Sequence, residues 1–533
     1  MSTDPQEKHR FGSRLSREDD VFIGIIVFLG GMTSIGTELS LSRLIAPFFG
    51  DSTFIWANVI GLTMTFLALG YWIGGRLADR YPRVWLFYSI TALAAVWSAL
   101  LPYLARPILQ FSLEAFDDVA VGAFYGSLVG VLLLLAVPIT LLGFVSPYAI
   151  RLRMSSVDRA GDIAGKTYAL GTFGSIAGSF LPVLLLIPWV GTRRTFLILG
   201  LLLFIPSLIG LLRQRAMLQA GFATLLALAV GIVSIVNAGG AIRPAQGGTL
   251  VYETESGDNY IQVVQDGTTF KLSLNEGHAT HSIYDPTRQL TQGPWDYFMV
   301  APLFYPQAGQ ATLDSALLIG LAGGTVSKQL TQAYGPVAID GVEIDAEIAQ
   351  VGRDWFDMNE PNLNVIIEDG RYVLRTSDET YDLIGVDAYK QPYIPFQLTT
   401  REFFQEVYDH LEPGGVAVIN VGRTDTDYRL VDAVSSTMRD VFPSVYLIDT
   451  ERYTNTIVIA TRDATSLETF TESVRNQPEG SLVRQVGEAS IATGNLREVT
   501  EVTTVFTDDH APVEWVIDQI ILNAAREEAS ENP

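Results

Sequence analysis

Seven long apolar stretches occupy the first 238 residues of this 533-residue chain. A helix needs about 20 residues to cross a hydrocarbon core of about 30 Å, and each stretch is long enough. Glycines such as Gly31, Gly70 and Gly174 recur inside them and would let helices approach closely in lipid. The sequence therefore predicts a multi-pass α-helical membrane domain over residues 21–238, after a disordered polar tail at residues 1–20. The stretches lie near residues 21–48, 54–78, 84–105, 120–150, 163–190, 193–212 and 216–238.

Two charged residues, Glu38 and Arg43, lie inside the first stretch. A charge near the centre of a bilayer costs at least about 2.5–3.5 kcal/mol when it has no partner. We therefore expect the two side chains to pair with each other, with another helix or with a bound group. A structural pair and a substrate or lipid site both satisfy this requirement.

The basic residues predict an orientation for these spans. The N-terminal tail and the loops after the second, fourth and sixth stretches hold 13 Lys and Arg residues, whereas the opposite loops hold three. Because basic residues favour the cytoplasmic side, the N-terminus is expected there, in a multi-pass protein of the cell membrane. Seven crossings would then place residues 239–533 outside. Either one stretch does not cross, or that part works outside, or the charge rule fails here.

Charge is divided unevenly along the chain. Residues 1–238 hold 17 Lys+Arg and 13 Asp+Glu, a net of +4, which leaves 18 and 45 for residues 239–533, a net of −27. Such an acidic segment repels nucleic acid and would suit a cationic substrate. An acidic surface of the kind found in salt-rich cytoplasm would give the same composition. The absence of cysteine excludes disulfides and thiolate catalysis, and the five histidines suggest no metal site.

The second half contains four short apolar runs that each end in a glycine or an acid, with helix-like segments between them. This pattern, at residues 315–325, 341–345, 368–371 and 381–389, is typical of a parallel α/β sheet with its site at the carboxyl ends of the strands. After the first run, Gly320, Gly323 and Gly324 let the backbone turn tightly and approach a ligand. A helix from about Thr325 would point free N–H groups at the same place.

Acidic residues follow the next three runs. Glu343 comes 23 residues after Gly320, where an acid commonly binds ribose hydroxyls. Asp369, followed by Gly370, could accept a hydrogen bond from an adenine amino group, and Asp387 would point into the same crevice. Together these residues predict a site for an adenosine-type cofactor. Alternatively, the acids only solubilise the ends of the strands.

The remaining segments complete the expected domain organisation. Residues 249–290 alternate in the manner of strands around an Asp266-Gly267 turn and predict a small β unit. Residues 275–277, with the segment from His281 to Pro286, are expected to form a loop over the crevice. Residues 291–522 would form the α/β domain, with about seven strands of which the last are antiparallel, and residues 523–533 a polar tail.

These residues resemble the spermidine synthase (polyamine aminopropyltransferase) family, of class I methyltransferase-like, Rossmann-like fold. The resemblance covers roughly residues 250–421 and is greatest to the branch that carries N-terminal transmembrane helices. It implies that the loop with Gly320, Gly323 and Gly324, together with Glu343, Asp369 and Gly370, binds the nucleoside, and that Asp387 is catalytic. Residues 399–404 and 507–514 also resemble segments of the family or of this branch.

The acceptor side departs from the family pattern. The family's loop aspartate is replaced by Gly323, and its second acid after the catalytic one by Lys390. Its Tyr-His-Glu becomes Pro294-Trp295-Asp296, and its early glutamine becomes Asn259. These differences make putrescine a doubtful acceptor. The acceptor-side candidates are Asn259, His281, Tyr284, Asp296, Tyr389 and Lys390, with His281 either a proton shuttle or an ordinary loop residue.

The function implied by the resemblance is transfer of an aminopropyl group from decarboxylated S-adenosylmethionine to a small amine, with Asp387 accepting the amine's proton and with no metal. S-adenosylmethionine-dependent methyl transfer is the first alternative, because Gly323 removes an acid that would bind the aminopropyl ammonium. A non-enzymatic membrane transporter or sensor with a nucleoside-binding domain is the second. The expected partners are the lipid bilayer and a small amine, with no nucleic acid, and a homo-oligomer is compatible with the sequence.

Overall fold

A computed structural model describes most of the chain as two compact units. The first comprises Met1–Asp117 with Gly122–Arg243, and the second Pro244–Pro533 with Asp118–Val121. Most of the expected N-terminal tail, residues 276–277 of the expected loop, and nearly all of the expected C-terminal tail lie outside the described residues. The described ranges are residues 16–49, 53–114, 122–154, 159–237, 242–275, 279–304, 312–390, 393–492, 494–520 and 523.

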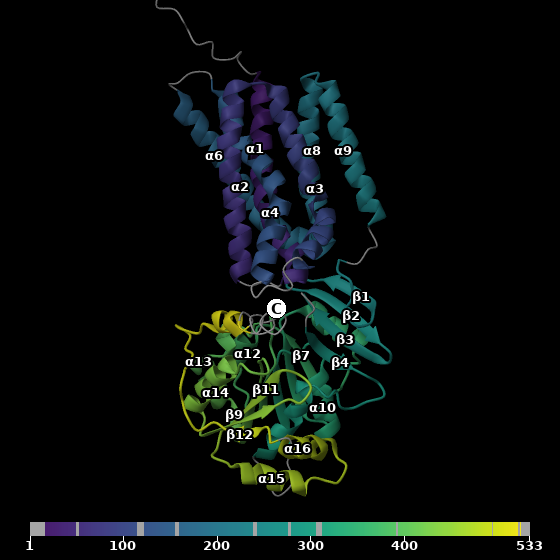
Figure 1. Ribbon diagram of the computed structural model, residues 1–533, viewed down its shortest axis with the longest axis vertical. Helices are drawn as coiled ribbons and strands as arrows, with labels where there is room; N and C mark the ends of the chain where they lie inside the picture. Colours follow the sequence, from purple (N-terminus) through teal and green to yellow (C-terminus); the bar gives the residue numbers. More distant parts are fainter. Residues whose placement is uncertain are drawn as a thin grey trace, which may run out of the picture. The chain divides into compact units, whose positions relative to one another are not determined.

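The described part of the first unit is helical (Figure 1). Within these ranges, seven segments are long and apolar enough to cross a membrane, in agreement with the seven apolar stretches of the sequence. The fourth segment joins two helices, α4 and α5, and the fifth joins α6, a π-helical turn and α7. The elements are α1 (Arg17–Phe49), α2 (Thr53–Arg80), α3 (Val84–Glu114), α4 (Gly122–Gly143), α5 (Val145–Arg153), α6 (Ala160–Leu181), η2 (Pro182–Leu186), α7 (Ile187–Val190), α8 (Thr192–Arg213) and α9 (Met217–Val236).

Glycine determines how closely two pairs of helices approach. Between α1 and α6, a Cβ on Gly31 would lie 2.2 Å from the carbonyl oxygen of Gly171, and one on Gly174 would lie 1.8 Å from that of Phe28. Between α2 and α4, a Cβ on Gly70 would lie 2.3 Å from the carbonyl oxygen of Thr140. Any side chain at these positions would push the helices apart, as expected for small-residue packing between apolar helices.

The first helix begins earlier than the sequence indicated. Residues 17–20, assigned above to a disordered tail, form the first turn of α1. Glu18 pairs with Arg213 at 2.5 Å and Asp20 with Arg153 at 2.7 Å, so acids of the first turn hold α1 to α8 and α5. Acidic side chains also stabilise a helix N-terminus, which explains why this polar segment is helical.

Direct pairing of Glu38 with Arg43 is not observed. Neither residue takes part in any of the ion pairs found among the described residues, and the buried Oε2 of Glu38 has no hydrogen-bond partner there. The physical reason is helical geometry, because neighbours on one face of a helix are three or four residues apart and these two are five apart. A role of Glu38 in binding stays a prediction.

The second unit begins with a four-stranded antiparallel sheet in the order β1-β2-β3-β4. Its inward side chains, Ile261, Val263 and Leu272, pack with Ile348 of the helix α11 (Ala346–Trp355) and with Phe356 in the turn after it. This sheet corresponds to the expected β unit, and the hairpin between β2 and β3 turns at Asp266-Gly267. Its strands are β1 (Thr249–Glu255), β2 (Tyr260–Asp266), β3 (Thr269–Leu274) and β4 (Thr280–Tyr284).

The main sheet has eight strands in the order β12-β10-β11-β9-β8-β5-β6-β7. From β9 to β7 the strands are parallel, whereas β10, β11 and β12 pair in antiparallel fashion. The expected seven strands were one too few, because the three-residue β12 has no run of alternating residues that a pattern could detect. The strands are β5 (Ser315–Ile319), β6 (Ala338–Glu343), β7 (Leu363–Ile367), β8 (Tyr381–Val386), β9 (Leu411–Gly422), β10 (Ser444–Asp449), β11 (Asn455–Thr461) and β12 (Leu496–Glu498).

Helices cover both faces of this sheet, as its alternating residues require. In β5, Leu317 and Ile319 belong to one core and Ala316 and Leu318 to the other. The first core includes α12 (Gly370–Thr376), α13 (Arg401–Asp409) and α14 (Arg429–Val441), and the second includes η3 (Pro294–Phe304), α10 (Thr325–Tyr334), α15 (Leu467–Asn476) and α16 (Leu482–Ala492). The helix α11 (Ala346–Trp355) lies between β6 and β7 in sequence.

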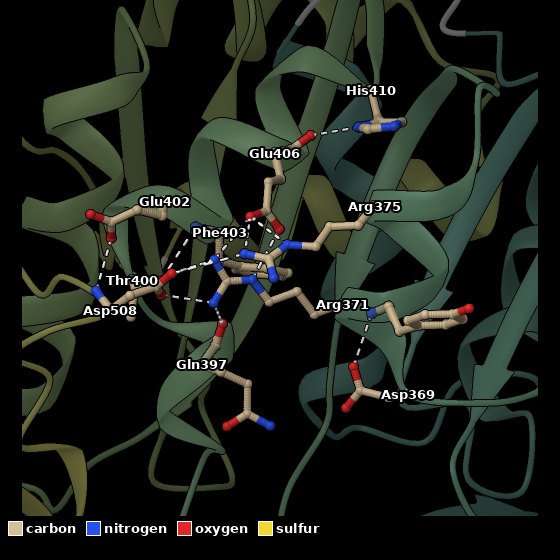
Figure 2. A network of polar contacts seen from close by, with 11 residues as sticks. Asp369, Arg371, Arg375, Gln397, Thr400, Glu402, Phe403, Glu406, His410 and Asp508 are labelled. Atoms are coloured by element: carbon tan, nitrogen blue, oxygen red, sulfur yellow. Dashed lines mark hydrogen bonds and ion pairs between the residues drawn. The ribbon is translucent and has the colours of Figure 1, made fainter.

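Arg371 joins two segments that are 137 residues apart in sequence (Figure 2). Its guanidinium donates to both oxygens of Glu406 at 2.9 Å and to those of Asp508 at 2.7 and 2.9 Å. Asp508 also accepts from the hydroxyl of Thr400, and its backbone N–H donates to Glu402. The segment around Asp508 is thereby fixed to α12 and to the start of α13.

We expect Arg371→Met to release this segment. Arg371 has a side chain only 8% exposed and two carboxylate partners, so its loss removes the buried cation between them and leaves the half-exposed Arg375 as their nearest counterion. Breaking a buried pair costs about 3–5 kcal/mol, and the partial exposure of Asp508 favours the lower end. Hydrogen exchange of residues 506–510 in the full chain measures the free energy of local opening. The control, Arg375→Met, removes a half-exposed cation from Glu406 and should cost about 0–1 kcal/mol.

We also expect the effects of Glu38→Gln and Arg43→Gln on the free energy of unfolding to add within about 0.5 kcal/mol, because the two residues share no contact. Unfolding in detergent followed by circular dichroism measures the four proteins of the cycle. Asp20→Asn with Arg153→Gln is the matched control, since that pair is bonded at 2.7 Å and should be non-additive. Coupling between Glu38 and Arg43 as large as in the control would show that they interact.

Candidate functional site

The site is built where the order of the main sheet reverses. The chain runs from β5 outward through β6 and β7, then returns to the other side of β5 as β8. At this switch point Asp387 donates its backbone N–H to the carbonyl of Ile319 at 2.8 Å. Gly320 has a φ of +91°, and a Cβ there would lie 2.5 Å from the carbonyl oxygen of Asp387. The glycine therefore permits the loop after β5 to touch the end of β8, in the crevice where α/β sheets bind ligands.

Glu343, at the end of β6, binds the backbone of the glycine loop that follows β5. One carboxylate oxygen accepts the backbone N–H of Ala322 at 2.9 Å, and the other accepts that of Asp345 at 3.2 Å. Burial raises the pKa of Glu343 to about 7, although these two N–H groups act in the opposite direction. Gly324 caps the following helix with a φ of +80°. Glu343 thus lies where a ribose acid is expected, and its role as a ribose ligand remains a prediction.

Asp369 and Gly370 follow β7 and begin α12. Asp369 accepts the backbone N–H of Tyr372 at 2.9 Å as the N-cap, and its role as a ligand of an adenine amino group remains a prediction. A Cβ on Gly370 would lie 2.3 Å from Cγ2 of Ile319, so glycine is needed there for packing of α12 against β5. Sequence reasoning gave Gly370 a role in binding alone, and this contact adds a structural one.

Four apolar side chains near this edge of the sheet are exposed and were missed by sequence reasoning. They are Ile344 at 58%, Ile367 at 45%, Tyr372 at 57% and Phe396 at 50% exposure. Three of them stand at or just after the ends of β6 and β7, beside the predicted ribose and adenine acids. An adenine ring is flat and apolar on its faces, so these side chains would offer it a surface. For Ile344 alone the sequence offered a signal, an apolar residue directly after the strand-end acid Glu343.

A cavity of about 380 Å³ opens beside Asp387. It brings together three of the sequence-predicted residues, Asp387, His281 and Tyr389, with Ala322 of the glycine loop. The helix at residues 513–520 supplies Ile517 and Ile520 to its wall. Further lining residues are Ala279, Thr280, Pro294, Trp295, Asn420, Gly422, Arg423, Thr424, Leu430, Tyr453, Thr454 and Asn455.

Asp387 is held by neutral donors. Asn420 donates its side-chain N–H to Asp387 at 2.9 Å, and Asn455 donates to the amide oxygen of Asn420 at 2.9 Å, which fixes the orientation of that amide. Trp295 also donates a side-chain hydrogen bond to Asp387. Burial raises the pKa of Asp387 to about 7, and these donors only partly offset it. A carboxylate with this pKa can accept a proton near neutrality.

The hydroxyl of Tyr389 is occupied by the backbone of β9. It donates to the carbonyl of Asn420 at 2.8 Å and accepts the N–H of Gly422 at 2.9 Å. Burial, and then the charge of Asp387, raise the pKa of Tyr389 above its usual range. Tyr389 therefore positions the end of β9, which carries Asn420, and presents its ring to the cavity.

His281 lies on β4, not in a loop as the sequence suggested. The next residue, Ser282, accepts the N–H of Gly323 at 2.8 Å, so β4 is attached directly to the glycine loop. The imidazole Nε2 is buried and has no hydrogen-bond partner among the described residues. Burial lowers the pKa of His281 to about 4, so the ring is neutral at pH 7.

The other four acceptor-side candidates do not line this cavity. Asn259 donates to Asp345 at 2.8 Å, and Tyr284 lines a separate cavity of about 290 Å³. Asp296 is buried and accepts from the backbone of Thr291 and Gln292 and from Gln329, which holds the turn before η3. Lys390 is exposed and its backbone bridges to Tyr393. The polarity of these residues in the sequence could not reveal that Asn259 and Asp296 bind other protein groups, or that Tyr284 and Lys390 lie outside this cavity.

Gly323 has no space for the acid that the resembling family carries. A Cβ there would lie 2.9 Å from Cβ of Ser282 and 3.0 Å from the ring of Phe356. An aspartate at this position would displace β4 or α11. Within the described ranges, no group of three His, Asp or Glu side chains is placed to hold a metal ion.

Comparison with known proteins identifies the domain around this site. Residues 306–470 match the family described as Spermine/spermidine synthase domain. A probable polyamine aminopropyl transferase of Bifidobacterium longum is 33% identical over 309 residues, which cover 52% of this chain and 65% of that protein. The eEF1A lysine and N-terminal methyltransferase of Xenopus laevis is 29% identical over 177 residues, or 30% of this chain and 25% of that protein.

Among solved structures, a probable spermidine synthase from Corynebacterium glutamicum aligns with a TM-score of 0.36 and 21% identity, over 49% of this chain and 99% of the other. The chain spans less than two thirds of the length of both curated relatives named above. The match of residues 306–470 to a spermine/spermidine synthase domain confirms the resemblance inferred from the strand-end residues.

Proposed function

We propose that the second unit is an aminopropyltransferase that uses decarboxylated S-adenosylmethionine and a small amine. The observation that carries the proposal is Asp387, a carboxylate with a pKa near neutrality in a cavity beside the glycine loop. The family match and the aminopropyl transferase among the relatives support the same assignment. The first unit would hold this enzyme at a membrane, as its seven apolar segments suggest.

The residues of the site would have different roles in the reaction. Glu343, Asp369 and the exposed side chains of Ile344 and Tyr372 would hold the nucleoside. Its sulfonium makes the adjacent carbon electrophilic. The amine nitrogen forms a bond to that carbon while the carbon–sulfur bond breaks, and the electron pair of that bond stays on sulfur as a neutral thioether. Asp387 accepts the proton that the nitrogen then loses.

Methyl transfer from S-adenosylmethionine is the second candidate. The observation in its favour is Gly323, where contacts with Ser282 and Phe356 leave no room for an acid to bind an aminopropyl ammonium. One relative is a lysine and N-terminal methyltransferase, which also acts on amines. Both reactions need the same alignment of amine and carbon, so the group on sulfur decides between them.

The nucleoside assignment predicts that Ile344→Lys weakens binding of methylthioadenosine at least about tenfold, because a charged chain would replace the apolar surface offered to adenine. Calorimetry on the full chain in detergent measures the affinity. Val502→Lys is the matched control, since Val502 is also exposed, at 48%, and lies outside the proposed nucleoside site. Equal affinity of the Ile344 variant and wild type would remove Ile344 from the nucleoside site.

Asp387→Asn should lower the rate of transfer about 10²–10⁴-fold, the usual contribution of a general base. This loss of rate corresponds to a rise of about 2.7–5.4 kcal/mol in the activation free energy. In the wild type, the rate should fall as the pH drops below about 7, because the raised pKa leaves Asp387 protonated there and unable to accept a proton. Product formation with both donors and an amine panel, from pH 5 to 9, tests both statements.

Thioether affinity should be nearly unchanged in Asp387→Asn. Asp354→Asn, an exposed acid on α11, serves as the control with unchanged rate. Equal turnover by Asp387→Asn and wild type would refute the catalytic assignment. A parallel loss of rate and thioether affinity would instead make Asp387 a ligand of the nucleoside.

A further inference from the structure

A groove with a volume of about 420 Å³ opens on the side of the first unit, between α1 and α6. Gly24 lines this groove, and a Cβ there would lie 3.6 Å from Cδ1 of Leu170, an ordinary van der Waals contact. Glycine therefore leaves space that a larger side chain would fill. The volume falls in the range of ligand pockets, roughly 300–1,000 Å³. The other apolar lining residues are Val21, Ile25, Phe28 and Leu29 of α1.

One end of this groove is ionic. Asp20 of α1 and Arg153 of α5 line it, and Oδ1 of Asp20 lies 2.7 Å from Nε of Arg153. Among the described residues, three of the five N–H groups of Arg153 are bonded, two to Asp20 and one to Thr167. The side chain of Asp20 is 47% exposed, and a carboxylate has about four acceptor sites. The pair therefore retains N–H groups for an anion and acceptor sites for an ammonium.

The position of this pair along the helices matches the level of lipid headgroups. Arg153 is the last residue of the fourth apolar segment, and Asp20 is the third residue of the first. From Asp20 to Leu29, α1 advances about 14 Å at 1.5 Å per residue. The apolar walls of the groove thus run from the boundary of a hydrocarbon core into its interior, as the acyl chain of a phospholipid does.

A second groove on the first unit provides a contrast. It lies on α9, has a volume of about 570 Å³, and is lined by apolar side chains together with Gln219 and Gly221. Its described lining includes no Asp, Glu, Lys or Arg. An acyl chain finds an apolar surface in both grooves, whereas the groove between α1 and α6 also offers charged groups to a headgroup.

We propose that the groove between α1 and α6 binds one phospholipid with a phosphoethanolamine headgroup. The inference rests on the proposed placement of the first unit in a membrane. The remaining N–H groups of Arg153 donate to the phosphate, and the carboxylate of Asp20 accepts from the ammonium. An anionic headgroup without an ammonium brings a second negative charge beside Asp20, which is unfavourable. A choline headgroup has no N–H to donate to Asp20.

Native mass spectrometry of the full chain in detergent tests the headgroup. The protein is mixed with equal amounts of phosphatidylethanolamine, phosphatidylcholine and phosphatidylglycerol that have identical acyl chains. We expect one phosphatidylethanolamine retained per chain, at least about tenfold in preference to the other two, because its ammonium and its phosphate both form charge-assisted hydrogen bonds. Asp20→Asn should reduce this preference to about twofold or less and raise retention of phosphatidylglycerol, since the repulsion is removed. Equal retention of the three lipids by the wild type, or none, would overturn the proposal.

Two leucine substitutions test the place of binding. Gly24→Leu fills the groove between α1 and α6 without a backbone clash at its Cβ. Gly221→Leu is the matched control, because Gly221 lines the second groove and a Cβ there has no described heavy atom within 4 Å. We expect Gly24→Leu to lower retention of phosphatidylethanolamine about tenfold, through lost contact with the acyl chain, and Gly221→Leu to leave it unchanged. Unchanged retention in Gly24→Leu, or an equal loss in both variants, would refute the assigned groove.

Extraction of membranes at alkaline pH separates this proposal from the membrane placement on which it rests. A chain that stays in the membrane but shows no preference among the three lipids would refute the lipid site and leave the placement intact. A chain that is released into the soluble fraction would refute the placement, and the lipid site with it. We expect the chain to stay in the membrane and to retain phosphatidylethanolamine after purification.

Discussion

The close contact between Gly320 and Asp387 is the constraint on which the rest of the site depends. Strands β5 and β8 are parallel neighbours with Ile319 opposite Val386, so both chains leave the sheet at the same level. The hydrogen bond from Asp387 to the carbonyl of Ile319 then continues the pairing one residue beyond the strands. A side chain at Gly320 would collide with the backbone of Asp387, and separating them would move the carboxylate away from the loop that approaches the donor.

Two acids near this contact have the same raised pKa for the same reason, yet their partners differ. Glu343 accepts backbone N–H groups from Ala322 and Asp345, so its charge stabilises the loop whether or not a ligand is bound. Asp387 accepts from the side chains of Asn420 and Trp295, which belong to other elements. Because the donors to the Asp387 carboxylate are side chains, the backbone at the end of β8 can still form its hydrogen bond with β5. The environment of Glu343 therefore suits a fixed ligand group. The environment of Asp387 suits a group that takes up and releases a proton.

The strand-end residues of the sheet were predictable because each combines a buried apolar run with an acid or glycine at its end. That local pattern located Gly320, Glu343, Asp369 and Asp387 in the order in which the sheet places them. Asn420 and Trp295 carry no such pattern, since an asparagine in β9 and a tryptophan in η3 reach Asp387 only through tertiary packing. For the same reason, the sequence could not separate His281, which lines the cavity, from Asn259 and Tyr284, which do not.

The misassignment of residues 17–20 to a disordered tail has another physical cause. The first turn of α1 reads as a polar tail because the partners of its acids, such as Arg213 and Arg153, lie far along the chain. Likewise, Arg371 and Thr400, which are far from Asp508 in sequence, bind its carboxylate just before the helix that carries Ile517 and Ile520. Long-range interactions thus fix the segment that leads into this helix, whose apolar side chains line the cavity beside Asp387. Burial of Asp387 raises its pKa into the range useful for proton transfer.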